Sequence, residues 1–102
     1  MEVQKRGVVL MEIQRIQDKK FSAQVEGGEA VLLYRRGPQN SMDILGVEVP
    51  PPARGKNVAD QLMREALRKA KEEHVKVIAS CSYAESWFDR HPEEEDIIFH
   101  NE

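Results

Sequence analysis

The 102-residue sequence has little cysteine, no long apolar run and no large excess of charge of either sign. Cys81 is the only cysteine, which excludes an intramolecular disulfide and any metal site built on several thiolates. The longest apolar runs, Val8–Met11 and Ala30–Tyr34, are far shorter than the ~20 residues of a membrane-spanning helix. With 15 Lys and Arg against 18 Asp and Glu, the net charge is -3, and the basic excess of nucleic-acid-binding proteins is missing. We therefore expect a reduced, cytoplasmic protein that binds neither membranes nor nucleic acids.

The chain length is that of one domain, and we assign residues 1–102 to it. Residues 1–10 are either a loosely tied leader or an early edge strand. They lack the apolar stretch and the small-residue cleavage site of a signal peptide. We expect the domain to be a monomer and to hold no metal ion.

The first half of the chain predicts an antiparallel meander of strands. From Lys20 to Glu26, Phe21 and every second residue after it are apolar, whereas Ser22 and every second residue after it are polar. This period is typical of a half-exposed strand. Gly27-Gly28 then indicates a tight turn, because both residues tolerate a positive φ. The expected strands are residues 12–17 (weak), 20–26, 30–36 and 42–49, with turns at 18–19 and 37–41.

The second half changes to a helical period. Residues 58–73 carry one apolar stripe, and His74 follows as a cation that suits the helix C-terminus. Residues 75–80 are a short apolar strand. A strand, a helix and a strand form a right-handed crossover, so the strands at 42–49 and 75–80 should be parallel.

The C-terminal region predicts a short helix at residues 83–90, with Trp87 as a packing anchor. His91 is expected in a turn, and residues 93–96 form an exposed acidic run. The overall prediction is an α/β (α+β) fold with a mixed, mostly antiparallel sheet, a β-α-β crossover and a C-terminal helix.

The segment Arg54–Ala59 lies between a strand and the long helix, which is where chemistry is expected. A helix N-terminus has free amide donors and a positive dipole end, and it binds anions such as phosphate. Gly55 lets the backbone approach a ligand, and Asn57 accepts a left-handed conformation. Lys56 adds positive charge. The alternative is an ordinary helix start with Asn57 as the N-cap.

Several motifs in this order resemble the GNAT N-acetyltransferase superfamily, and in particular a subfamily of small, single-domain GNAT-like proteins. The resemblance covers roughly residues 21–98. The motifs are Val49-Pro50, Arg54-Gly55-Lys56-Asn57-Val58-Ala59, Lys76-Val77-Ile78, Ser80-Cys81-Ser82-Tyr83 and His91-Pro92.

The resemblance implies a binding site for acetyl-coenzyme A. The pantetheine arm would pair with the backbone near Val47 and Val49, in the wedge where the two parallel strands separate, and Tyr83 would also contact the cofactor. The pyrophosphate would be bound by the loop residues Arg54, Gly55, Lys56, Asn57, Val58 and Ala59.

The resemblance also implies catalytic roles for Cys81 and Glu48. Cys81 would lie near the thioester and act as the nucleophile, so that the acetyl group passes through an acetyl-cysteine. Glu48 lies on the strand where many GNAT enzymes have a general base, and Val47 and Val49 would face the other side of the sheet. The alternatives are a small buried Cys81 and a solvated Glu48.

The sequence departs from the subfamily pattern at two places. Asn57 replaces the second glycine of the loop, and Gly46-Val47 replaces a common His-Thr pair. We predict an N-acetyltransferase that binds acetyl-coenzyme A and acts on an unidentified amine. The alternatives are a non-catalytic module that binds coenzyme A or a partner, and an interaction domain that uses its acidic tail.

Overall fold

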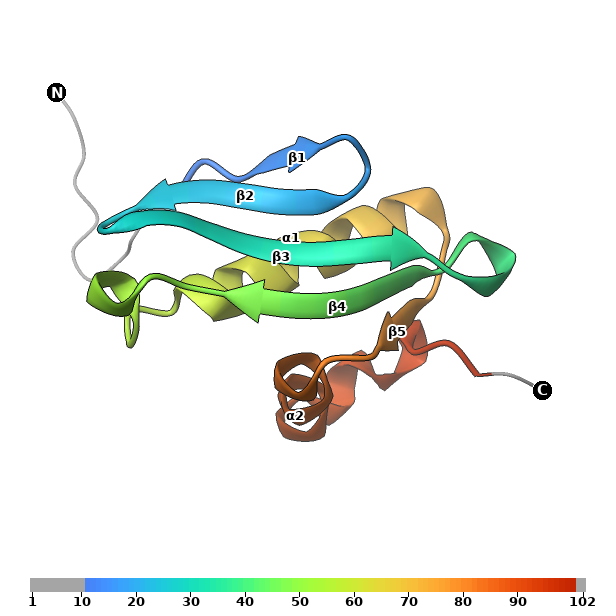
Figure 1. The fold of residues 1–102 in the computed structure, drawn as a ribbon. Coiled ribbons are helices and arrows are strands. Elements are labelled where there is room, and N and C mark those ends of the chain that lie inside the picture. Colours follow the sequence, from blue (N-terminus) through green and yellow to red (C-terminus); the bar gives the residue numbers. More distant parts are fainter. Residues whose placement is uncertain (1–10, 101–102) are drawn as a thin grey trace, which may run out of the picture.

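The computed structural model describes residues 11–100, and its order of elements, β-β-β-β-α-β-α, is the predicted one (Figure 1). The prediction for residues 1–10 lies outside the described residues. The strands are β1 (Gln14–Ile16), β2 (Lys20–Val25), β3 (Gly28–Arg36), β4 (Met42–Glu48) and β5 (Val77–Ala79), and the helices are α1 (Val58–Glu73) and α2 (Ser82–Arg90). Short 3-10 turns cover Pro38–Asn40, Pro51–Ala53 and Pro92–Ile97.

The five strands form one mixed sheet in the order β1-β2-β3-β4-β5. The pairs from β1 to β4 are antiparallel, whereas β4 and β5 are parallel and are joined through α1. The predicted mixed sheet with its β-α-β crossover is therefore confirmed.

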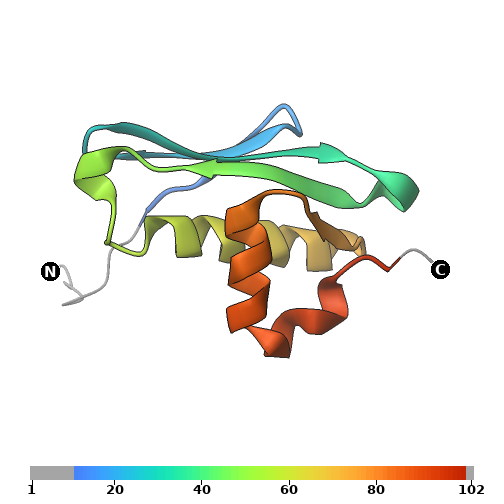
Figure 2. The same cartoon turned by 60° about the horizontal axis from the view of Figure 1, so that its bottom comes forward.

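Both helices lie on one face of the sheet (Figure 2). The apolar stripe of α1 explains its position, because six of its side chains are buried there. Trp87 on α2 is fully buried in the same core. The stripe consists of Val58, Leu62, Met63, Ala66, Leu67 and Ala70.

The turn between β2 and β3 begins one residue earlier than predicted. Its two loop residues are Glu26 and Gly27, while Gly28 already pairs with Val25. Gly27 has a φ of 90°, and a Cβ atom there would lie 2.8 Å from the side chain of Pro52. Close packing against the proline turn, and not only the turn itself, therefore requires a glycine at this position.

Two further details differ from the predictions. Ser22 was expected on an exposed face, but it is only 7% exposed, because its hydroxyl group donates to the carboxylate of Glu29 on the neighbouring strand. Strand β5 is shorter than residues 75–80, because the amide of Val75 still donates to the carbonyl of Ala70 at the end of α1.

Strand β4 separates from β5 halfway along its length. A bulge places Leu45 as an extra residue opposite β3, and the pairing with β5 ends at Ile44. The amides of Ser80 and Cys81 both donate to the carbonyl oxygen of Ile44, at 3.0 and 3.2 Å. Beyond this point β4 continues to Glu48, whereas the segment that follows β5 turns into α2. The two strands thus open a wedge at this end of the sheet.

Candidate functional site

The wedge exposes backbone groups of β4. Ile44 pairs with Tyr34 on β3 and directs its carbonyl group toward β5. Val47 pairs with Leu32, which lies two residues before Tyr34 on β3. The backbone groups of Val47 therefore face the same edge of β4 as those of Ile44. Because β5 has already ended, the amide and carbonyl groups of Val47 face the open wedge.

The loop that leads into α1 presents an uncapped helix N-terminus. Gly55 and Asn57 both have a left-handed backbone, with φ values of 79° and 66°. Asn57 occupies the N-cap position, but its side chain makes no cap hydrogen bond. The helical ladder begins with the amide of Gln61, which donates to the carbonyl of Asn57 at 3.1 Å. The amides of Val58, Ala59 and Asp60 therefore precede the ladder and remain available to an anion.

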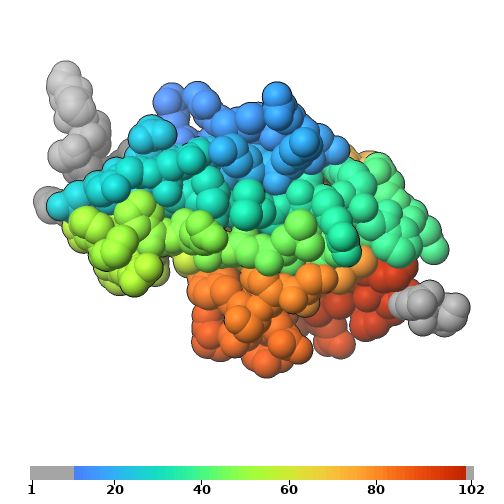
Figure 3. All heavy atoms as spheres, in the orientation of Figure 1, coloured from blue at the N-terminus to red at the C-terminus, as the bar shows by residue number. Residues whose placement is uncertain are grey.

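Two adjoining hollows lie between this loop, the end of β4 and α2. The smaller, of about 240 Å³, follows the loop, and the larger, of about 660 Å³, follows the end of β4. In Figure 3 the outline of the molecule is hollowed between the residues that follow β4 and α2. Both hollows are lined by Val49, Arg54, Ala59 and Tyr83, and we call them together the wedge cavity.

Most of the predicted cofactor residues line the wedge cavity. Gly55, Asn57 and Val58 line the smaller hollow, and Val47 lines the larger one. Lys56 lines neither, because its ammonium group pairs with Glu26 on the β2–β3 turn at 2.8 Å. The fold therefore brings most of these predicted residues together at the wedge cavity, and Lys56 lies at its margin.

Arg54 is turned toward the end of β4. Its Nε donates to the carbonyl oxygen of Val49 at 3.0 Å. This bond holds the loop against the strand, and it occupies a carbonyl group that the sequence analysis assigned to the pantetheine arm.

Tyr83 forms the α2 side of the wedge cavity. Burial raises the pKa of its phenol, and the negative charge of Asp60 raises it further. The hydroxyl group therefore stays protonated at neutral pH and can donate a hydrogen bond into the cavity.

The two predicted catalytic residues are placed differently. Glu48 is exposed and lines the larger hollow. Cys81 is the N-cap of α2, where its Sγ accepts a hydrogen bond from the amide of Ala84 at 3.3 Å, and it packs against the core. Cys81 lines neither hollow. Cys81 as a residue is half-buried.

Sequence reasoning missed two residues near the cavity. Glu29 lines the larger hollow beside Glu48, because the start of β3 lies next to the end of β4 in the antiparallel pair. Asp60 accepts a hydrogen bond from Trp87, which is 27 residues further along the chain. No local pattern indicates such a contact. The nearest signal is a carboxylate in the first turn of a helix, which the helix dipole by itself favours.

Two findings concern metal binding and membrane-spanning helices. Within residues 11–100, no group of three or more His, Cys, Asp and Glu side chains is placed to hold a metal ion. No helix in the same part of the chain has the length and apolar character needed to cross a membrane.

Comparisons with known proteins agree with this geometry. A sequence profile described as GCN5-related N-acetyl-transferase matches residues 20–97. The chain is similar to Protein NATD1 of Mus musculus, with 32% identity over 78 residues that cover 74% of this chain and 71% of that protein. For NATD1 of Homo sapiens the identity is 30%, with 72% and 67% covered.

A solved structure has the same fold. It is an NMR structure of a GCN5-like protein from Staphylococcus aureus, with a TM-score of 0.68 and 25% sequence identity. The match covers 89% of this chain and 90% of that one.

Proposed function

Because the chain belongs to the GCN5-related N-acetyltransferase family, we propose that it binds acetyl-coenzyme A in the wedge cavity and transfers the acetyl group to an amine. The observation that carries this proposal is the uncapped start of α1. Gly55 and Asn57 are left-handed there, and free amides border a hollow of about 240 Å³. An ordinary structural helix start would carry a side-chain cap.

The binding roles follow from the geometry of the cavity. The amides of the loop and the dipole of α1 would bind the pyrophosphate. The backbone of Val47, which faces the open side of β4, would pair with the pantetheine arm, and the groups of Val49 would become available when Arg54 moves from its carbonyl. The loop residues involved would be Arg54, Gly55, Lys56, Asn57, Val58 and Ala59.

The transfer step requires a proton acceptor and a proton donor. Acetyl-coenzyme A supplies an activated acetyl group as a thioester. When the amine nitrogen bonds to the carbonyl carbon, the carbon–sulfur bond breaks and the amine loses a proton. Glu48 would accept that proton, and the neutral phenol of Tyr83 would give its proton to the leaving sulfur, so that coenzyme A leaves as a thiol and proton exchange with water restores both side chains.

Cys81 offers a second route for the same transfer. Its thiol would lose a proton and take the acetyl group, which releases the thiol of coenzyme A. The amine would then take the acetyl group from the sulfur and restore the thiol of Cys81.

The chemistry of the larger hollow favours a positively charged acceptor. Glu29 and Glu48 both line it. The hydroxyl group of Ser22 and the ammonium group of Lys20 hold the pKa of Glu29 below its ordinary value, so this carboxylate stays ionised. Two carboxylates would bind an ammonium group, as on a lysine side chain or a polyamine, better than a neutral or anionic amine.

Binding is tested by titrating acetyl-coenzyme A into labelled protein and recording amide resonances. We expect the resonances of Gly55 to Ala59 and of Val47 to shift together, while those of the β1–β2 turn stay in place. If the loop resonances do not move at millimolar acetyl-coenzyme A, the proposal is wrong.

The route of transfer is tested by mass spectrometry. After incubation with acetyl-coenzyme A, the Cys81 route predicts one added acetyl group on the wild-type protein and none on Cys81→Ala. Full turnover by Cys81→Ala, without a labelled intermediate, leaves direct transfer as the mechanism.

A non-catalytic coenzyme A-binding module is the second candidate. Two observations favour it: Cys81 lies outside both hollows, and Gly46-Val47 replaces the His-Thr pair of the subfamily. Acetyl-coenzyme A that binds, but is hydrolysed slowly and at the same rate with every amine tested, would support this candidate.

A further inference from the structure

One hydrogen bond joins the two helices behind the wedge cavity. The indole Nε1 of Trp87 on α2 donates to Oδ1 of Asp60 on α1 at 2.8 Å. The other oxygen of Asp60 accepts from Arg64 at 2.9 Å, and the guanidinium group of Arg64 lies over the indole ring at 5.5 Å from its centroid. Trp87 is fully buried, so this contact is fixed by the core.

The two partners stand next to the walls of the cavity. Asp60 directly follows Ala59, the last residue of the loop that lines the cavity. Tyr83 precedes Trp87 by four residues, so the two side chains share one face of α2. The bond between Asp60 and Trp87 therefore joins the helix that follows the loop to the helix that carries Tyr83.

The electrostatics of Asp60 support a role that reaches the cavity. Burial works to raise the pKa of Asp60, but the hydrogen bonds from Trp87 and Arg64 outweigh it, and the pKa is lowered. Asp60 thus stays ionised, and its charge is one of the causes that raise the pKa of Tyr83.

We propose that Asp60 and Trp87 are a positioning pair, which holds Tyr83 on α2 at a fixed distance from the Arg54–Ala59 loop and keeps its hydroxyl group in the wall of the wedge cavity. This inference rests on the proposed function. It assigns to the two residues a task beyond packing, because a purely structural contact would affect stability without changing the state of Tyr83.

The first experiment removes the hydrogen bond and keeps an aromatic ring. Trp87→Phe should weaken acetyl-coenzyme A binding about tenfold, because binding must then also fix Tyr83 and the loop at one distance. Phe21→Leu is the matched control, because Phe21 is buried in the same core but lies on β2, where its ring stacks on Tyr34. It should lower stability and leave the affinity within about threefold of the wild type.

The second experiment separates the bond from the charge. Asp60→Asn keeps an oxygen that accepts from Trp87, so it should bind acetyl-coenzyme A nearly as well as the wild type, whereas Asp60→Ala should resemble Trp87→Phe. In the ligand-free protein, a carbon-labelled tyrosine titration should show the pKa of Tyr83 lowered in Asp60→Asn. Glu65→Gln, further along α1, should leave that titration unchanged, because Glu65 is not among the groups that shift the pKa of Tyr83.

The possible results separate the two proposals. If the wild type does not bind acetyl-coenzyme A, the proposed function is wrong. If the wild type binds, and Trp87→Phe and Asp60→Ala bind equally well, only the positioning pair is wrong, whatever the Tyr83 titration shows.

Discussion

The two ends of α1 are built in opposite ways. At its C-terminus, His74 takes a left-handed conformation and its amide closes the helix on Ala70 and Lys71. At its N-terminus, Asn57 takes the same conformation, but no side chain caps the helix. Charged groups are paired around both ends, but only at the N-terminus do the backbone amides of Val58, Ala59 and Asp60 precede the helical ladder without a side-chain cap. The contrast separates an end that stabilises the fold from an end that is suited to bind an anion.

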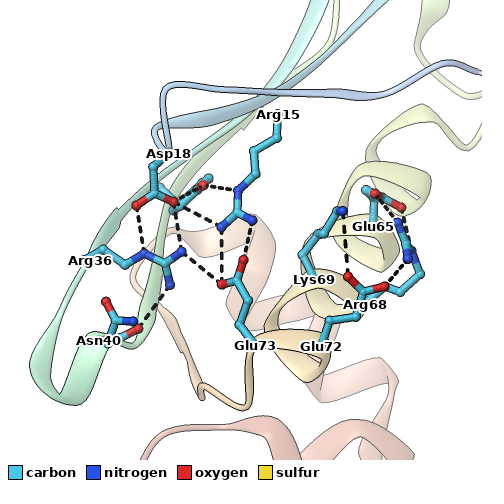
Figure 4. Close-up of polar contacts among 10 residues, drawn as sticks. Arg15, Asp18, Arg36, Asn40, Glu65, Arg68, Lys69, Glu72 and Glu73 are labelled. Carbon is cyan, nitrogen blue, oxygen red and sulfur yellow. Dashed lines mark hydrogen bonds and ion pairs between the residues drawn. The ribbon is translucent and has the colours of Figure 1, made fainter.

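The C-terminal end of α1 is held by an ion-pair network (Figure 4). Glu73 accepts from Arg15 and Arg36, and Asp18 accepts from the same two arginines and from the hydroxyl group of Tyr34. The network joins the β1–β2 turn, the end of β3 and the end of α1. We call these five residues the closed-end network, because each charge in it has an opposite partner.

The largest effect is expected at the N-terminal end of α1, where no side chain caps the helix. Gly55→Val should weaken acetyl-coenzyme A binding more than tenfold, because a branched side chain is strained at a φ of 79° and the loop amides would turn away from the cavity. The stability cost should be about 1–2 kcal/mol. Isothermal titration calorimetry and urea unfolding measure the two quantities.

The matched variants for this position sharpen the comparison. Asn57→Gly relaxes a residue that is already left-handed, so it should keep both stability and affinity. Gly46→Ala is the folding control, since a Cβ atom there meets nothing within 4 Å. Equal affinity of Gly55→Val and the wild type would show that the loop conformation does not serve cofactor binding.

An intermediate effect is expected at the closed end. Hydrogen bonds from Arg36 outweigh burial and, with one from Tyr34, lower the pKa of Asp18 to about 2, from an ordinary 3.8. A lowered carboxylate pKa stabilises the fold above pH 4, and this stabilisation is lost as the pH falls from about 4 to 2. Asp18→Asn should therefore cost about 1 kcal/mol at pH 7, because half of the side chain is exposed and solvent screens the pair.

Urea unfolding at several pH values checks this prediction. The stabilities of Asp18→Asn and the wild type should converge as the pH approaches 2. Asp89→Asn on α2 is a suitable control and should show no such convergence. A constant difference between Asp18→Asn and the wild type from pH 7 to pH 2 would mean that the charge of Asp18 does not stabilise this end.

The smallest effect concerns the ion pair between Lys56 and Glu26. Glu26→Gln frees the ammonium group of Lys56 to move toward the wedge cavity. The affinity for acetyl-coenzyme A should therefore rise about twofold to threefold at low salt. The gain should vanish at high salt, because exposed charges are screened. Lower affinity at every salt concentration would show that Glu26 supports the loop instead of competing for Lys56.

The regular elements could be predicted from the sequence because their signals are local. The helix of α1, the strand β2 and the turn at residues 18–19 each depend on neighbouring residues, and the structure confirms them. The left-handed backbone at Gly55 and Asn57 was predictable for the same reason, since few residue types accept it. The turn at Gly27 begins one residue earlier than predicted, because Gly28 already pairs with Val25 across the two strands.

The candidate site was predicted only in part. The loop residues were found from their spacing and from a family resemblance, whereas Glu29 was missed because it joins the cavity through the pairing of strands. The placement of Cys81 outside the two hollows could not be predicted either. It depends on the geometry at the start of α2, where the sulfur of Cys81 accepts a hydrogen bond from the amide of Ala84.

The sequence by itself determined the elements, their order and the family, because apolar periodicity and turn chemistry act over a few residues. Only the tertiary structure decided that β4 separates from β5 after Ile44 and that Lys56 turns to Glu26. It alone also joined Asp60 to Trp87 behind the cavity. These features arise from contacts between residues 20 to 40 positions apart, and their geometry is set by the packing of a whole sheet and two helices.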